Sequence, residues 1–390
     1  MAKHAILSPS GASRWLACTP SARLEQKFKD RAGKAAEEGT LAHAIAEQLL
    51  LYKLGRITAA KFNLEHFEFK KDALYNEEMF DYVKEYVNEV LEVFSEAQAI
   101  SKDAIIMLEQ RVYMYDYAVE CDGTADVVII ANGNMWVIDL KYGKGVKVEA
   151  EENKQLMLYG LGSFLAHDFA YGIDKLHLTI KQPRLNASST YEISAKDLTA
   201  WAEMELKPLA ALAYAGDGKF KPGAHCQFCK AKGSCRTLAE YNLDIVKHDF
   251  KQPDLLEPDE ISDIILKSKF FTDWLKGVGD YAFAQALAGV KWPGLKLVEG
   301  RSNRAYADEQ KVIEVLRKEG IEEIKIFEPL EVLGITKMEK SIGKNVFNSL
   351  LTPLVIKPKG KPTLVAESDK RAEFNDASAD FDGFDSDEEI

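Results

Sequence analysis

The sequence lacks any long apolar run. None of its runs approaches the roughly 18 apolar residues that a membrane-spanning helix needs, and the N-terminal MAKHAILSPS has no apolar region of a secretory signal. We therefore expect a cytoplasmic protein with no membrane partner. Cysteine is scarce, at 5 of 390 residues, and in a cytosolic chain clustered cysteines suggest metal binding rather than disulfides. The length is sufficient for a large core and for two domains.

The chain also lacks an excess of basic residues. Its formal net charge is −12, which at first sight argues against a nucleic-acid partner. However, residues 373–390 hold eight acids and no base, so the remainder carries only about −4, from −12 plus 8. A basic groove can exist within that balance, and net charge therefore does not exclude DNA.

The most informative stretch is residues 123–145, which read GTADVVIIANGNMWVIDLKYGKG. Asn132-Gly133 predicts a two-residue type I′ turn, because such a turn needs positive φ at both central positions. The runs on either side, 124–130 and 135–141, are rich in β-branched and apolar residues. The stretch therefore predicts a β-hairpin.

Two carboxylates face each other in this predicted hairpin. Pairing outward from the turn places Asp126 opposite Asp139, with Cβ atoms about 5 Å apart. Like charges repel at that distance, and a divalent cation would remove the conflict because hard cations take oxygen ligands. Lys141 lies two residues after Asp139 and points to the same face. The alternative is a pair of solvated aspartates on an exposed face, but the Asp-Leu-Lys triplet and the flanking apolar runs favour a metal site.

The hydrophobic periodicity predicts alternating helices and strands around the hairpin. In chain order these are helices at 34–54 and 75–97, a strand at 105–113, the hairpin, a helix at 153–169, a strand at 176–182 and a helix at 194–214. This order predicts an α/β core with a central mixed sheet flanked by helices. Further on, the pattern predicts helices at 257–287, 308–318 and 338–351, and a strand-and-turn segment at 289–306.

The change of character after residue 245 suggests a domain boundary. We expect a first domain at 1–245, a smaller α+β domain of unknown role at 246–371, and a disordered acidic tail at 372–390. The tail carries Phe374, Phe381 and Phe384 among its acids, which gives it apolar groups that can bind a partner.

Several polar side chains lie on the predicted elements around the hairpin. His43 lies on the first helix, and a single histidine there is usually a core or surface residue. Gln155 and Tyr159 share one helix face at i, i+4 spacing. Glu109 lies on the strand before the hairpin and is a candidate to bind a metal or to support its ligands, although Arg111 could simply pair with it.

Three cysteines are spaced as metal ligands, with two and five residues between them: Cys226, Cys229 and Cys235. Three thiolates are one short of the usual four for a zinc or iron–sulfur site. Cys18 is one possible fourth ligand, about 208 residues away in the sequence, and would then tie the N-terminus to the end of the first domain. Zinc completed by His225 is an equal possibility.

The segments GTLAH, GTADVVII, VIDLKYGKG and QLMLY resemble, in order and spacing, the RecB-type branch of the PD-(D/E)XK nuclease superfamily. The resemblance covers roughly residues 1–245 and implies a restriction-endonuclease-like core. It implies a catalytic set of His43, Asp126, Asp139 and Lys141. Mg²⁺ or Mn²⁺ would be held by His43, Asp126, Asp139 and the carbonyl of Leu140. Gln155 and Tyr159 would contact DNA.

The cysteine layout is similar to the iron–sulfur subgroup of these nucleases. The resemblance implies a structural 4Fe–4S cluster on Cys18, Cys226, Cys229 and Cys235, with zinc as the alternative. The whole chain also resembles a phage and prophage protein family of this type, through SPSGASRWLAC, LVEGRSNR and KGKPTLVAESDKR. If the protein is phage-encoded, its location is the bacterial host cytoplasm.

These resemblances imply a metal-dependent DNA nuclease that acts in phage DNA replication, recombination or repair, and they lean toward exonuclease action on DNA ends. One alternative is a catalytically inactive DNA-binding partner with a nuclease fold, and a second is a zinc-containing scaffold. The acidic tail resembles the Phe-containing tails of single-strand-binding proteins. We expect it to bind single-strand-binding or other replication and recombination proteins.

Overall fold

The computed structural model describes residues 5–28, 33–246, 258–298 and 309–318, with 335, 338, 343–351, 354 and 355. The chain divides into two compact units, Met1–Gly294 and Leu295–Ile390. The domain boundaries expected after residues 245 and 371 stay predictions. The acidic tail expected at 372–390 lies outside the described residues.

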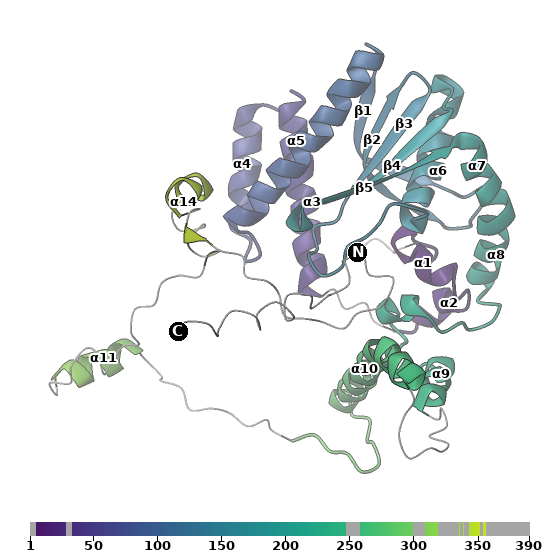
Figure 1. The fold of residues 1–390 in the computed structure, drawn as a ribbon, viewed down its shortest axis with the longest axis vertical. Coiled ribbons are helices and arrows are strands. Elements are labelled where there is room, and N and C mark those ends of the chain that lie inside the picture. The colour runs from purple at the N-terminus through teal and green to yellow at the C-terminus, as the bar shows by residue number, and fades with distance from the viewer. Residues whose placement is uncertain are drawn as a thin grey trace, which may run out of the picture. The chain divides into compact units, whose positions relative to one another are not determined.

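A five-stranded mixed sheet forms the centre of the first unit (Figure 1). Its strands lie in sequence order: β1 (Ile105–Tyr113), β2 (Asp122–Ala131), β3 (Asn134–Leu140), β4 (Lys175–Gln182) and β5 (Ala187–Ser194). Only β3 and β4 are parallel, and helix α6 (Lys154–Tyr171) connects them. The predicted α/β class with a mixed sheet flanked by helices is therefore confirmed. Strand β5 was not predicted, because its sequence ASSTYEIS has no apolar run.

The hairpin is formed as the sequence predicts. The turn residues Asn132 and Gly133 have φ values of 46° and 74°, both in the left-handed region that a type I′ turn requires. The β2–β3 ladder then runs through five residue pairs in the predicted register. It ends one pair before Asp126 and Asp139, so the strands separate where the two carboxylates begin.

Helices α3 (Lys34–Lys53) and α5 (Glu77–Ile100) pack on one face of the sheet, and α6 packs on the other (Figure 1). Helix α5 is strongly amphipathic, and the apolar residues of its stripe are buried. Asn76 caps its start by accepting a hydrogen bond from the Met79 N–H. The short helix α4 (Ala59–Phe69) follows α3 and was not predicted.

The single helix predicted at 194–214 is divided in the structure. It consists of α7 (Ala195–Trp201), a π-helical turn (Ala202–Leu206) and α8 (Lys207–Ala215). Pro208 explains the interruption, because proline has no N–H for the intrahelical bond at that position.

The N-terminal helices α1 (Ala12–Trp15) and α2 (Ser21–Glu25) lie against the chain that follows α8. The Thr19 hydroxyl donates to the Asp217 carbonyl at 2.6 Å, and the Lys230 N–H donates to Glu25 at 2.8 Å. These bonds join residues about 200 positions apart. Hydrogen bonds therefore join the two ends of the predicted first domain.

The described part of the chain after this region is helical. It contains α9 (Arg236–Val246), α10 (Pro258–Leu287), α11 (Glu309–Lys318) and α14 (Lys344–Leu351). The strand-and-turn segment predicted at 289–306 is described only up to residue 298, and those residues contain no strand. None of the described helices is long and apolar enough to cross a membrane.

Candidate metal centre

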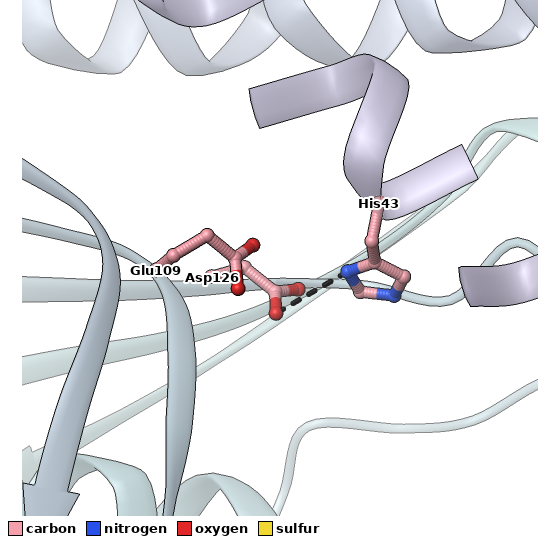
Figure 2. A group of neighbouring side chains, drawn as sticks. All are labelled: His43, Glu109 and Asp126. Carbon is pink, nitrogen blue, oxygen red and sulfur yellow. Dashed lines mark ion pairs between the residues drawn. The ribbon is translucent and has the colours of Figure 1, made fainter. Parts of the chain in front are cut away.

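Three side chains from three different elements converge beside the sheet (Figure 2). They are His43 of α3, Glu109 of β1 and Asp126 of β2, and one ligand atom of each lies within 4.8 Å of the other two. His43 Nδ1 is 3.3 Å from Asp126 Oδ1. Within the described residues, no other group of three histidine, cysteine or acidic side chains is as compact.

The backbone at this point is strained. Glu109 has a φ of 47°, and for a residue with a side chain the left-handed region costs roughly 1–2 kcal/mol. The β1–β2 ladder omits the one pair that Glu109 and Asp126 would form. The alternation of side chains also reverses there. Ile106 and Val112 are an even number of residues apart and would share one face of a regular strand. Instead, Ile106 packs with α3 and α5, whereas Val112 packs with α6 on the opposite face. This local distortion brings the carboxylates of Glu109 and Asp126 close to each other.

A second network lies directly beside this group. Lys141 Nζ is 2.8 Å from Asp139 Oδ2 and donates to Gln155 Oε1 at 2.9 Å. The Gln155 amide nitrogen is 3.4 Å from Asp139 Oδ1 and 3.2 Å from the Tyr159 hydroxyl. All four residues were selected from the sequence, and the structure brings them together in one hydrogen-bonded set.

The backbone of Leu140 links the two networks. Its N–H donates to Asp126 Oδ2 at 2.8 Å, which fixes the orientation of that carboxylate. This contact uses the N–H of Leu140, whereas the family resemblance implies that its carbonyl is a metal ligand. The ligand role of the carbonyl stays a prediction. Arg111 does not pair with Glu109 but with Asp122.

The charges of the two networks perturb one another. Burial lowers the pKa of His43, but its hydrogen bond to Asp126 and the charges of Asp126 and Asp139 outweigh burial and raise the pKa to about 9. Burial, followed by the charge of Asp126, raises the pKa of Glu109 to about 7. Burial also raises the pKa of Asp139, against the opposing charge of Lys141. These carboxylates are costly to ionise without further positive charge.

Two oxygen atoms near the site are buried away from solvent. Asp139 Oδ2 faces the Lys141 ammonium at 2.8 Å. The hydroxyl of Tyr86, a residue of α5 that is 2% exposed, has no hydrogen-bond partner among the described residues. Burial raises the pKa of Tyr86 well above its usual value, and the charges of Asp126 and Asp139 add to this effect. A buried hydroxyl without a partner costs free energy.

Tyr86 is not among the site residues predicted from the sequence. Its only signal is that it supplies the one hydroxyl among the buried residues of the α5 stripe. An aromatic residue at that spacing is ordinarily a core residue, so the pattern alone gives no reason to choose it.

The cysteines selected from the sequence line one pocket between α1, α2 and the chain before α9: Cys18, Cys226, Cys229 and Cys235. The Lys221 N–H lies 3.5 Å from Cys18 Sγ, in a weak hydrogen bond. Burial raises the pKa of Cys18 and Cys226, and it raises that of Cys229 to about 12. The four sulfur atoms do not form a compact group, because no three of them lie within 4.8 Å of one another.

Comparison with known proteins identifies the family. A family model described as "Protein of unknown function (DUF2800)" matches residues 4–372, and the chain therefore belongs to that family. A solved structure described as "Crystal structure of SSO0001" is 13% identical, and the match covers 50% of this chain and 84% of that chain at a TM-score of 0.23. A likeness at that score carries no argument about fold or function.

Proposed function

We propose that this member of the DUF2800 family is a metal-dependent DNA nuclease with a PD-(D/E)XK core of the RecB type. One observation supports this most strongly: the group of His43, Glu109 and Asp126 adjoins a paired Asp139 and Lys141. A cation-binding group beside a fixed ammonium is the arrangement that hydrolysis of a phosphodiester needs.

The side chains present fit a hard divalent cation. Carboxylate oxygens and a neutral imidazole are suitable ligands for Mg²⁺ or Mn²⁺. His43, Glu109 and Asp126 would hold the ion, and Asp139, whose charge acts on His43, is a further candidate ligand. A cation would also offset the burial and the charge of Asp126, which together raise the pKa of Glu109. Glu109 thereby changes from a secondary candidate to a proposed ligand.

When bound, the ion would polarise the scissile phosphate and lower the pKa of a water molecule. Lys141 is held by Asp139 and Gln155 at 2.8 and 2.9 Å, so its ammonium has a fixed position before substrate arrives. We assign it to offset charge on the phosphate and to orient the attacking water. Gln155 keeps Lys141 in place and, with Tyr159, borders the site where the DNA strand would lie.

The cysteine pocket fits a structural metal group in composition, because it provides four thiols from distant parts of the chain. A tetrahedral zinc site with Zn–S bonds of about 2.3 Å needs sulfur atoms roughly 3.8 Å apart. No three sulfurs of this pocket lie within 4.8 Å of one another, so the four do not have that spacing. A 4Fe–4S cluster tolerates wider spacing because each thiolate binds a different iron, and we therefore retain 4Fe–4S as the proposed group and zinc as the alternative.

The test is cleavage of end-labelled single- and double-stranded DNA in Mg²⁺, Mn²⁺ or EDTA. We expect metal-dependent shortening of labelled ends, which is lost in Asp139→Asn and in Lys141→Ala. The matched controls are Asp81→Asn and Lys84→Ala, an exposed pair on α5 whose atoms are 2.6 Å apart. Both controls should cleave as the wild-type protein does.

Two results would count against the proposal. Full activity in Asp139→Asn would refute the assigned site. No cleavage by anaerobically purified protein that binds DNA would favour the catalytically inactive DNA-binding partner instead.

A further inference from the structure

The loop between β3 and α6, residues 141–153, begins and ends in the candidate site. It starts at Lys141 and leads to Gln155, two residues that are hydrogen-bonded to each other. Its middle is exposed and basic, with Lys144 and Lys147 and with two glycines whose surroundings are open. Such a loop would ordinarily have no fixed conformation, because glycine adds backbone freedom.

One buried side chain fixes this loop. Gln182, the last residue of β4, is 2% exposed. Its Oε1 accepts the N–H of Val148 at 2.7 Å, and its amide nitrogen donates to the carbonyl of Val146 at 3.0 Å. Beyond these, the N–H of Ala150 donates to the Ser189 hydroxyl at 3.0 Å. The loop is thus held at three backbone positions by side chains of β4 and β5.

The position of Gln182 needs an explanation. A buried primary amide costs free energy unless its polar atoms are paired, and an apolar residue at the end of a strand is the simpler choice. Both polar atoms of Gln182 are used to hold residues 146 and 148, one on each side of Lys147. The arrangement therefore orders a lysine-bearing segment rather than the core.

The lysines of the loop are available for a new partner. Lys147 pairs with Glu149 at 2.7 Å, and both side chains are about half exposed. Exposed ion pairs of this kind contribute little to stability because solvent screens them, so Lys147 can exchange Glu149 for a phosphate at small cost. The two lysines lie three residues apart in a loop whose ends are next to the proposed catalytic residues.

From these contacts we infer that the β3–α6 loop is a DNA-backbone-binding element. Lys144 and Lys147 contact phosphates next to the one that is cleaved, and Gln182 is the positioning residue that holds the loop in place. The inference rests on the proposed function only in taking DNA as the substrate.

The first experiment measures DNA binding apart from cleavage. Affinity for a duplex oligonucleotide is determined at several salt concentrations in the Asp139→Asn background, with Ca²⁺ as the ion. Each lysine that contacts a phosphate contributes about 1 to the slope of log affinity against log salt. We expect Lys144→Gln with Lys147→Gln to reduce the slope by about 2.

The matched control is Lys70→Gln with Lys71→Gln, directly after the end of α4. These lysines are also exposed and paired with acids, at 2.9 and 2.6 Å, and their replacement should leave the slope unchanged. An unchanged slope in the Lys144 and Lys147 variant overturns the inference. The binding experiment does not measure cleavage. A wild-type protein without nuclease activity would therefore refute the proposed function, but it would leave the measured salt slopes unaffected.

The second experiment tests the positioning role of Gln182. Gln182→Leu should accelerate trypsin cleavage after Lys144 and Lys147 and should raise the KM for DNA more than it lowers kcat. Ser189→Ala, which removes a less buried contact, should shift both readouts in the same direction by a smaller amount. Unchanged proteolysis in folded Gln182→Leu would show that the amide does not order the loop.

Discussion

Glu109 illustrates how a single residue can conflict with its element. A strand residue is expected to adopt extended φ, and glycine in a strand is less stable than alanine by about 0.5–1 kcal/mol. At position 109 the φ of 47° makes glycine more stable than alanine, because only glycine adopts this φ without a steric cost. Such strain persists at sites where a side chain must be held in one direction.

This reversal gives a prediction. The free energy of unfolding, measured by urea denaturation, should be larger for Glu109→Gly than for Glu109→Ala by about 1 kcal/mol. Both variants should lose Mn²⁺ affinity, measured by calorimetry, since both lack the carboxylate. Glu109→Gln tests the charge alone and should also bind Mn²⁺ weakly. An alanine variant as stable as the glycine variant would mean that the backbone is not strained.

The raised pKa values of His43 and Glu109 predict how the stability of the protein depends on pH. Both pKa values are raised in the folded protein, to about 9 and about 7. Without metal, the folded state therefore binds more protons than the unfolded state from about pH 4.5 to 9, and stability falls as pH rises. The His43 contribution is complete below about pH 6.5 and is lost as pH rises through 9.

The measurement is urea denaturation in EDTA from pH 5 to 9. His43→Asn should flatten the decline between about pH 6.5 and 9 and leave the decline at lower pH. Since an imidazole must lose its proton to bind a metal, Mn²⁺ affinity should rise with pH over the same interval. A stability curve that is identical in wild-type protein and His43→Asn would contradict the assigned pairing with Asp126.

At the scale of elements, Gly123 allows β2 to lie close to α6. A Cβ atom at this position would be 2.9 Å from both Tyr159 and Pro9, shorter than any normal contact. Gly123→Ala should displace the Tyr159 ring, whose hydroxyl is hydrogen-bonded to Gln155. We expect a loss of about 1–3 kcal/mol in stability together with reduced DNA cleavage.

The control for this substitution is Gly39→Ala in α3. A Cβ at Gly39 meets no atom within 4 Å, and alanine is favoured over glycine inside a helix by about 1 kcal/mol. Denaturation should therefore show opposite signs for the two glycine-to-alanine changes. Equal effects would indicate that the Tyr159 contact has no special role.

At the scale of the whole molecule, contacts between distant parts of the chain decide the architecture. The segment around Cys18 touches residues 217–230 through hydrogen bonds that span about 200 positions. If the proposed cluster binds Cys18, Cys18→Ser should lower both the iron content and the thermal stability of protein purified without oxygen. The control is Cys121→Ala, a buried core position away from the pocket, which should keep its full iron content. Unchanged iron and Tm in Cys18→Ser would remove this cysteine from the proposed cluster.

The sequence by itself determined the features that depend on neighbouring residues. The Asn132-Gly133 turn fixes the hairpin, since few dipeptides accept two positive φ values, and the hairpin fixes the register that leads to Asp126 and Asp139. Periodicity was sufficient for α5, whose apolar residues form one buried stripe. It failed for β5, an edge strand with little to bury.

Only the tertiary structure decided which side chains meet. His43 reaches Asp126 because α3 packs beside the sheet, and no local pattern predicts that contact. Glu109 joins them through a backbone conformation that its residue type disfavours, so propensity argues against it. In the sequence, Tyr86 resembles a core aromatic residue and Gln182 is the end of a strand. Only the packed structure shows that the Tyr86 hydroxyl is buried without a partner and that the Gln182 side chain is hydrogen-bonded. Packing determines which buried polar atoms find partners, and that information is absent from any single stretch of sequence.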